Sequence, residues 1–383
     1  MVHRPPARVL RMAASVSAAR AASASALHAA LRALRRAVLV AGCSAAAIAA
    51  FPVALAQPAS PTPASPTPSS PAAASPVPAV AADPGRFTAG IVRLDARVAD
   101  DATSAGSLGA RRSGSGVMLG PQLVLTIGYL LLEAEQVMVT TASGRRIPAA
   151  VAGYDHATGF GLARTVLPMD GTAIELGDSD LVKEKQTLLT QGQGETQATE
   201  LVVLSRKTFS GGWEYLIERP IYTFPPVSNW SGSALITQDG KLVGIGSLVV
   251  NDAATDRKGV PGNLFVPVNL LKPILSDLVA RGRRGDPVQP WLGLTTEMVR
   301  GALTVVRVAR DGPAEWAGVE PGDVVLGVGP ETVGDQADFY RRVWRLGPAG
   351  TDVPLRLRRG TAERSVSVKS VDRMETLRSP RGI

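Results

Sequence analysis

Short runs of apolar or alternating residues, punctuated by glycine, proline and aspartate, fill the chain between residues 86 and 267. These runs predict strands over residues 91–94, 116–119, 123–126, 137–140, 162–166, 201–204, 235–237 and 242–250. Many short strands with turn signals and little helix are typical of an all-β barrel or sandwich. The pattern therefore predicts a mainly β unit in the middle of the chain.

A helical repeat closes this region, and a smaller unit follows it. Apolar residues between 270 and 279 recur at helical spacing, which predicts a helix over 268–281. The Arg- and Gly-rich residues that follow are expected to form a hinge. Beyond the hinge, the pattern predicts strands over 303–308, 353–358 and 365–369 and a helix over 336–346. We therefore expect two folded units, over 86–282 and 286–372, and a C-terminal tail over 373–383.

The N-terminal 56 residues are typical of an export signal. They contain seven arginines and no acidic residue, and the apolar run over 37–56 ends in Ala54-Leu55-Ala56, which suits cleavage after Ala56. Two alternatives remain open: lipidation at Cys43, the only cysteine, and an uncleaved anchor, since about 20 apolar residues can span a bilayer. Residues 57–85 are rich in Pro, Ala and Ser, which predicts a disordered linker.

Charge and cysteine content narrow the function classes. The formal net charge is +8, but without the first 56 residues the chain has 34 Lys and Arg against 33 Asp and Glu. Because the rest of the chain has no marked excess of basic residues, we do not expect it to bind nucleic acid. A cleaved chain would also lack cysteine, so no disulfide is expected. The sequence predicts neither a metal nor a cofactor, and a membrane contact only if the N-terminus is retained or lipidated.

Residues 229–236 are similar to the turn that carries the nucleophile of a serine protease, with Ser231 as the candidate. The upstream stretch over 124–131 has Tyr129 where a base is needed. The chain has three histidines, and two of them, His3 and His28, lie in the predicted signal. We expect His156, in a polar loop, to be solvated. A lysine base remains formally open, but none of the candidates has a recognisable motif context: Lys183, Lys185 and Lys207.

The residues after the linker, from 86 to 371, resemble the Deg/HtrA-type proteins, which have a trypsin-like double β-barrel followed by a small α+β PDZ domain. The resemblance rests on four barrel segments, 114–117, 173–181, 239–245 and 263–269, and on the succession Gly312-Pro313-Ala314, Ala317-Gly318-Val319 and Pro321-Gly322-Asp323. It implies a mainly β protein of two domains.

The resemblance also implies a degenerate catalytic triad. Ser231 matches the family's nucleophile, but Tyr129 stands at the histidine position and Gly159 at the aspartate position. The oxyanion-hole region over Asn229, Trp230 and Ser231 lacks the usual glycine at 229, and Asn229 is expected to tolerate a left-handed conformation there. We therefore expect a pseudoprotease. An active endopeptidase with an unorthodox base, and an inactive subunit that partners an active homologue, remain open.

The same resemblance implies a peptide-binding role for the second unit. Its family captures a terminal carboxylate on backbone amides at the start of a strand, and this role falls to Trp291, Leu292, Gly293 and Leu294. Leu292 and Leu294 are expected to offer apolar surface to the ligand. The expected partners are peptides or unfolded proteins with a free C-terminal carboxylate, and related proteases in a homo- or hetero-oligomer. The expected location is the bacterial periplasm or cell envelope, in protein quality control.

Overall fold

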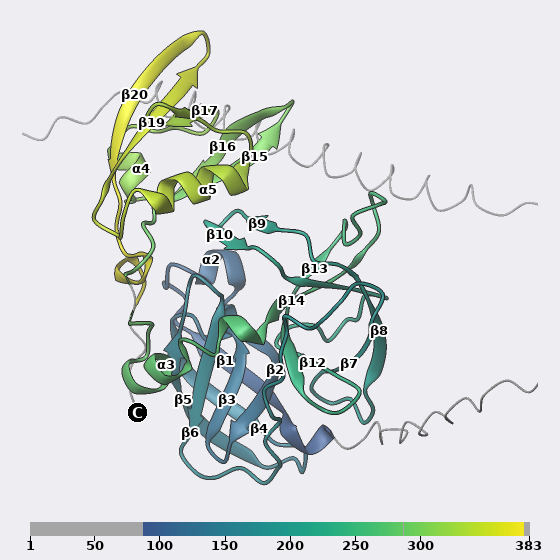
Figure 1. Ribbon diagram of the computed structural model, residues 1–383. Coiled ribbons are helices and arrows are strands. Elements are labelled where there is room, and N and C mark those ends of the chain that lie inside the picture. The colour runs from purple at the N-terminus through teal and green to yellow at the C-terminus, as the bar shows by residue number, and fades with distance from the viewer. Residues whose placement is uncertain (1–86, 286, 379–383) are drawn as a thin grey trace, which may run out of the picture. The chain divides into compact units, whose positions relative to one another are not determined.

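A computed structural model describes residues 87–285 and 287–378. The predicted signal, the linker and Cys43 lie outside these residues. The described chain is mostly β and forms two closed six-stranded barrels, followed by a separate sheet with two helices (Figure 1). None of its described helices is long and apolar enough to cross a membrane.

The first barrel contains the strands β1 (Ile91–Val98), β2 (Arg111–Gly120), β3 (Leu123–Ile127), β4 (Ala134–Thr140), β5 (Arg146–Tyr154) and β6 (Phe160–Thr165). Their order is β1-β2-β3-β6-β5-β4, and β1 pairs with β4 to close the barrel. Alternate residues of β1 point inward, so Val92, Leu94 and Ala96 are buried. Two short elements flank the strands, the helix α2 (Ala105–Leu108) and the 3-10 turn η2 (Gly128–Leu130).

The second barrel contains β7 (Thr187–Gln191), β8 (Thr199–Ser205), β11 (Ile221–Phe224), β12 (Ala234–Ile236), β13 (Leu242–Val250) and β14 (Gly262–Pro267). Their order is β11-β14-β13-β12-β7-β8, closed by pairing of β11 with β8. Between β8 and β11 the chain makes a separate hairpin of β9 (Phe209–Gly211) and β10 (Tyr215–Ile217). The sequence pattern did not predict this hairpin.

The predicted helix over 268–281 is wrong in its first half. The chain forms a 3-10 turn η3 (Val268–Leu270) and only then the helix α3 (Leu275–Arg281), which lies beside β5 (Figure 1). Pro273 stands between the two and has no backbone N–H, so a continuous helix would lose a hydrogen bond there. Gly282 ends α3 in the left-handed region, at φ 74°.

The last unit has the sheet order β15-β16-β17-β19-β20, which leaves β15 at an edge. Its strands are β15 (Leu294–Val299), β16 (Ala302–Val308), β17 (Val324–Val328), β18 (Glu331–Thr332), β19 (Asp352–Arg359) and β20 (Ala362–Lys369), with helices α4 (Pro313–Trp316) and α5 (Gln336–Arg345). Phe339 and Tyr340 of α5 pack into a core with Leu292, Leu294 and Val305. The predicted fold class, a trypsin-like double barrel followed by a PDZ domain, is confirmed.

Candidate functional site

The turn that carries Ser231 is packed against strand β2. The amide of Ser115 donates to the carbonyl of Ser231 at 2.8 Å. A β-carbon on Gly114 would lie 2.8 Å from that carbonyl and 3.0 Å from Oγ of Ser231, and one on Gly232 would lie 2.1 Å from the carbonyl of Ser115. Glycine is therefore required at 114 and 232, because the two backbones approach too closely for a side chain.

Tyr129, in η2, is hydrogen bonded to the candidate nucleophile. Its hydroxyl lies 2.8 Å from Oγ of Ser231 and donates to the carbonyl of Ser247 at 3.0 Å. A phenol has one hydrogen, so the hydroxyl of Ser231 must be the donor toward the phenolic oxygen. Burial raises the pKa of Tyr129 further above its ordinary value. The phenol therefore stays protonated and cannot take the serine's proton.

Gly159 lies in the turn between β5 and β6 with φ at 77°. Its carbonyl accepts from the amide of Gly128 at 2.7 Å. The space beside its α-carbon is filled by Tyr215, whose hydroxyl would be 2.7 Å from a β-carbon at 159 and donates to the carbonyl of Thr158 at 2.7 Å. Both the backbone conformation and this aromatic ring favour glycine over a carboxylate-bearing residue at 159.

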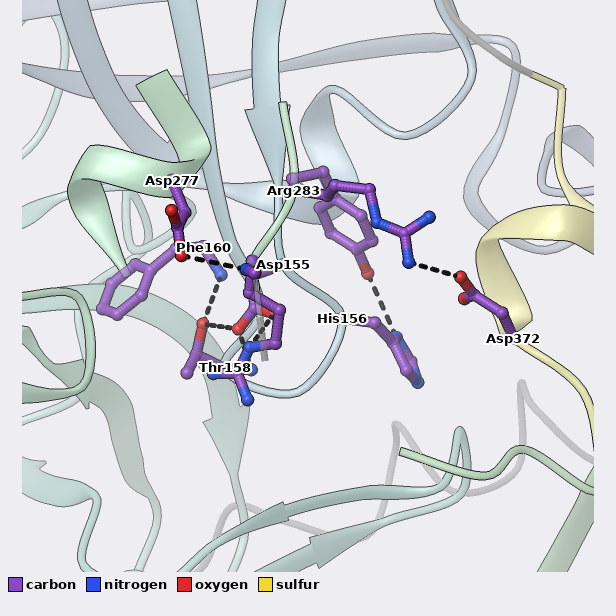
Figure 2. Close-up of polar contacts among 10 residues, drawn as sticks. Asp155, His156, Thr158, Phe160, Asp277, Arg283 and Asp372 are labelled. Carbon is purple, nitrogen blue, oxygen red and sulfur yellow. Dashed lines mark hydrogen bonds and ion pairs between the residues drawn. The ribbon is translucent and has the colours of Figure 1, made fainter. Parts of the chain in front are cut away.

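Asp155, four residues before Gly159, stabilises the same turn. Its buried carboxylate accepts from the amide of Thr158 at 2.9 Å and from the Thr158 hydroxyl at 2.6 Å, and Figure 2 shows these contacts. An ion pair joins it to Arg284, with Nε and Oδ1 2.9 Å apart. The Asp155 carboxylate therefore stabilises the turn between β5 and β6.

His156 is half-buried, so the expectation that it is solvated is wrong. Nη1 of Arg373 lies 2.9 Å from its Nε2, and the hydroxyl of Tyr154 lies 3.3 Å from its Nδ1. Burial and the charge of Arg373 lower the pKa of His156 well below its ordinary value. The imidazole is therefore neutral and has partners other than Ser231.

An apolar cavity of about 440 Å³ adjoins these groups. Its lining includes Tyr129, Tyr154, His156, Gly159, Tyr215 and Trp230. None of the lining residues, all from the described part of the chain, is a lysine. Lys207 instead pairs with Asp252, with Nζ and Oδ2 2.9 Å apart. The lysines left open by the sequence thus do not line this cavity.

The turn over Asn229, Trp230 and Ser231 differs from the expectation. Asn229 is not among the non-glycine residues with positive φ in the described chain, so the turn does not use the left-handed conformation that asparagine tolerates; Gly232 adopts it instead, at φ 74°. The side-chain amide of Asn229 donates to Oε1 of Glu195 at 3.1 Å. The carbonyl of Trp230 accepts from the amide and the hydroxyl of Ser233, at 3.1 and 3.0 Å.

Three consecutive amides at the start of β15 converge on a carboxylate, that of Glu214. Its Oε1 accepts from Gly293 and Leu294 at 2.7 and 2.9 Å, and its Oε2 accepts from Leu292 at 2.9 Å. We call these three amides the carboxylate cradle. The side chains of Leu292 and Leu294 are 0% and 2% exposed and pack in the core while Glu214 occupies the cradle, and the expectation that they offer apolar surface to a ligand stays a prediction. No motif in the sequence marks Glu214.

Fold and site together define a trypsin-like peptidase domain followed by a PDZ domain. Residues 114–245 match the family of trypsin-like peptidase domains, and residues 290–370 match the PDZ domain family. The combination and order of the two domains are those of the Deg/HtrA-type serine proteases.

Individual relatives support this architecture. The chain is 27% identical over 263 residues to the periplasmic serine endoprotease DegP of Salmonella typhimurium, covering 64% of this chain and 54% of that protein. It is 25% identical over 273 residues to DegP of Escherichia coli strain K12, covering 67% and 56%. A solved structure of a variant of the HtrA-type protease AlgW with a tripeptide superimposes with a TM-score of 0.50 at 20% identity, covering 77% of this chain and 96% of that one. The chain spans about half the length of the curated relatives it matches.

Proposed function

We propose that this chain is an exported Deg/HtrA-like protein that does not hydrolyse peptides and instead binds peptide C-termini through its PDZ domain. The hydrogen bond between Ser231 and Tyr129 is the observation that carries the proposal. The matched relatives are named as periplasmic serine endoproteases. Together with the predicted signal, these names favour the periplasm as the location of this chain.

The chemical argument for inactivity starts from the serine hydroxyl, which is a weak nucleophile until a base removes its proton. Tyr129 occupies the hydrogen-bonding position of such a base but stays protonated. Gly159 supplies no carboxylate, and Tyr215 fills the adjoining space. Loss of a single triad member already costs about 10⁴- to 10⁶-fold in rate, so we propose that no useful peptide hydrolysis remains.

The argument for peptide binding rests on the carboxylate cradle. PDZ domains bind a peptide as an added strand on a sheet edge, with its terminal carboxylate on backbone amides. In this chain the three cradle amides already bind a carboxylate, and β15 is an edge strand. A peptide with a free carboxylate therefore matches the chemistry of the site.

Casein degradation by the purified protein tests the first half of the proposal. We expect the same background rate for the natural chain and for Ser231→Ala, with an active HtrA protease as the positive control. A casein-degrading rate that Ser231→Ala abolishes would contradict the proposal.

A further inference from the structure

The carboxylate cradle has an occupant from the same chain. Glu214 lies in the loop of the β9–β10 hairpin, and its side chain is buried, with 4% of the residue exposed. Both of its carboxylate oxygens accept from cradle amides at 2.7 to 2.9 Å. These are the distances of charge-assisted hydrogen bonds, so Glu214 satisfies the cradle as the terminal carboxylate of a peptide would.

The rest of the hairpin lies along the same edge of the PDZ domain. The hydroxyl of Thr295, in β15, donates to the carbonyl of Gly212 at 2.8 Å, and the hydroxyl of Tyr340, in α5, donates to the carbonyl of Gly211 at 2.9 Å. Leu216 packs against the core of the domain. The segment 211–216 therefore presents a carboxylate and an apolar side chain to the domain, which are the two features of an apolar C-terminal residue.

Two features of the site would favour release of this segment by a peptide. Glu214 has φ at 55°, a region that non-glycine residues seldom adopt, so docking holds a strained backbone. A cavity of about 610 Å³ also adjoins the cradle, lined in part by Trp213, Gly293, Thr295 and Trp316. A peptide that enters this cavity can reach the cradle when the hairpin leaves it.

We propose that Glu214 is an internal ligand of the PDZ domain, and that a peptide with a free, apolar C-terminus binds by displacing the segment 211–216 from the cradle. This inference rests on the proposed peptide-binding function. The site would be closed in the resting protein, and its apparent affinity for peptide would fall in proportion to the fraction of molecules with an empty cradle.

Peptide affinity of the whole exported protein tests the inference. Fluorescence polarisation would be measured with a peptide that ends in a free apolar residue and with its C-terminally amidated form. We expect Glu214→Ala to tighten binding of the free-acid peptide at least tenfold over the natural chain. Glu214→Gln keeps the side-chain shape but replaces one accepting oxygen by an –NH2 group, which faces a cradle N–H donor and cannot accept from it, so it should show the same direction of change.

Glu218 provides a matched control on the same hairpin. Its carboxylate is exposed and pairs with Arg341 of α5, at 2.8 Å, away from the cradle. The pair is bidentate, but both side chains are about half exposed and solvent screens their charges, so Glu218→Gln should change peptide affinity no more than about threefold. Equal tightening by Glu214→Ala and Glu218→Gln would contradict specific occupation of the cradle, and no tightening by either Glu214 variant would overturn the inference.

Hydrogen exchange separates failure of this inference from failure of the proposed function. Saturating free-acid peptide should increase exchange in residues 209–217 of the natural chain. If the protein prefers the free-acid peptide but exchange in these residues does not increase, the proposed peptide binding is supported. Displacement of the segment 211–216 is then overturned. If no variant prefers the free acid over the amide, carboxylate capture itself is wrong, and the inference fails with it.

Discussion

The hydroxyl of Tyr215 lies where a side chain at Gly159 would begin, since a β-carbon at 159 would be 2.7 Å from that oxygen. The two residues come from different parts of the fold, the β5–β6 turn and the strand β10. Placing catalytic residue types at positions 129 and 159 is therefore not enough to rebuild a catalytic site, because Tyr215 fills the space beside position 159.

Restoring two side chains should not restore proteolysis. Tyr129→His with Gly159→Asp supplies an imidazole and a carboxylate, but the side chain introduced at position 159 meets Tyr215 and a φ of 77°. We expect casein hydrolysis to stay near background. Robust turnover by this double variant would show that the surrounding site had remained competent.

The strain at 159 is separately measurable. We expect Gly159→Ala and Gly159→Asp each to lower the free energy of unfolding by about 1–3 kcal/mol, because both add a β-carbon at positive φ against Tyr215. Urea unfolding measures this loss. A neutral Gly159→Ala would contradict the claim that backbone and ring exclude side chains there.

The close approach of β2 to the serine turn predicts a second stability difference. Gly114→Ala places a methyl group 2.6 Å from Cδ1 of Leu130 and 2.8 Å from the carbonyl of Ser231. Such overpacking should cost about 1–3 kcal/mol in the free energy of unfolding. Gly120→Ala on the same strand is the matched control, since its β-carbon would have no neighbour within 4 Å. Equal effects of the two substitutions would contradict the packing argument.

Peptide affinity should depend on pH through Glu214. Burial raises the pKa of its carboxyl from 4.5 to about 7 when docked, although the cradle amides and Arg373 act in the opposite direction. A raised pKa means that docking is strongest below pH 4.5 and weakens as pH rises through 7. The cradle should therefore open as pH rises, and the natural chain should bind free-acid peptide roughly 5- to 10-fold more tightly at pH 8 than at pH 6.

The charged and titratable side chains near Glu214 include those of Arg373, Arg307 and Tyr340, none of which is a carboxyl or imidazole group. Arg373 stacks on Trp213 and Trp291, Arg307 contacts Thr295, and the pKa of Tyr340 is raised above its ordinary value. Glu214→Gln should therefore bind peptide with nearly the same affinity at pH 6 and pH 8. Weaker peptide binding at pH 8 than at pH 6 in the natural chain would contradict the assignment of this pH dependence to Glu214. An equal change of affinity with pH in Glu214→Gln would contradict it too.

Local patterns were sufficient to predict much of the fold. Alternation located β1 and helical spacing located α5 within one residue, because in these two elements the buried face repeats at a fixed period. Continuous apolar runs located β3 and β13, which are buried over most of their length. The helix before α3 was mispredicted since apolar spacing continues through Pro273, while backbone hydrogen bonding does not.

Long-range packing explains what the sequence did not reveal about the site. The sequence placed Ser231 and Tyr129 as candidates, and they are in contact. Tyr215 and Glu214 carry no motif, because their roles come from a hairpin that meets Gly159 on one side and the carboxylate cradle on the other. His156 packs against Arg373, which lies 217 positions later in the chain, and against Tyr154, so its burial depends on contacts that the local sequence does not reveal.

Covalent labelling of Ser231 by a fluorophosphonate tests the central claim most directly, because the reagent reports activation of the serine and needs no peptide substrate. The natural chain would be incubated beside active trypsin, and the peptide that contains Ser231 would be analysed by mass spectrometry. With its proton held toward a protonated Tyr129, Ser231 should remain unmodified under conditions that label trypsin completely. Stoichiometric labelling of Ser231, absent in Ser231→Ala, would contradict the account.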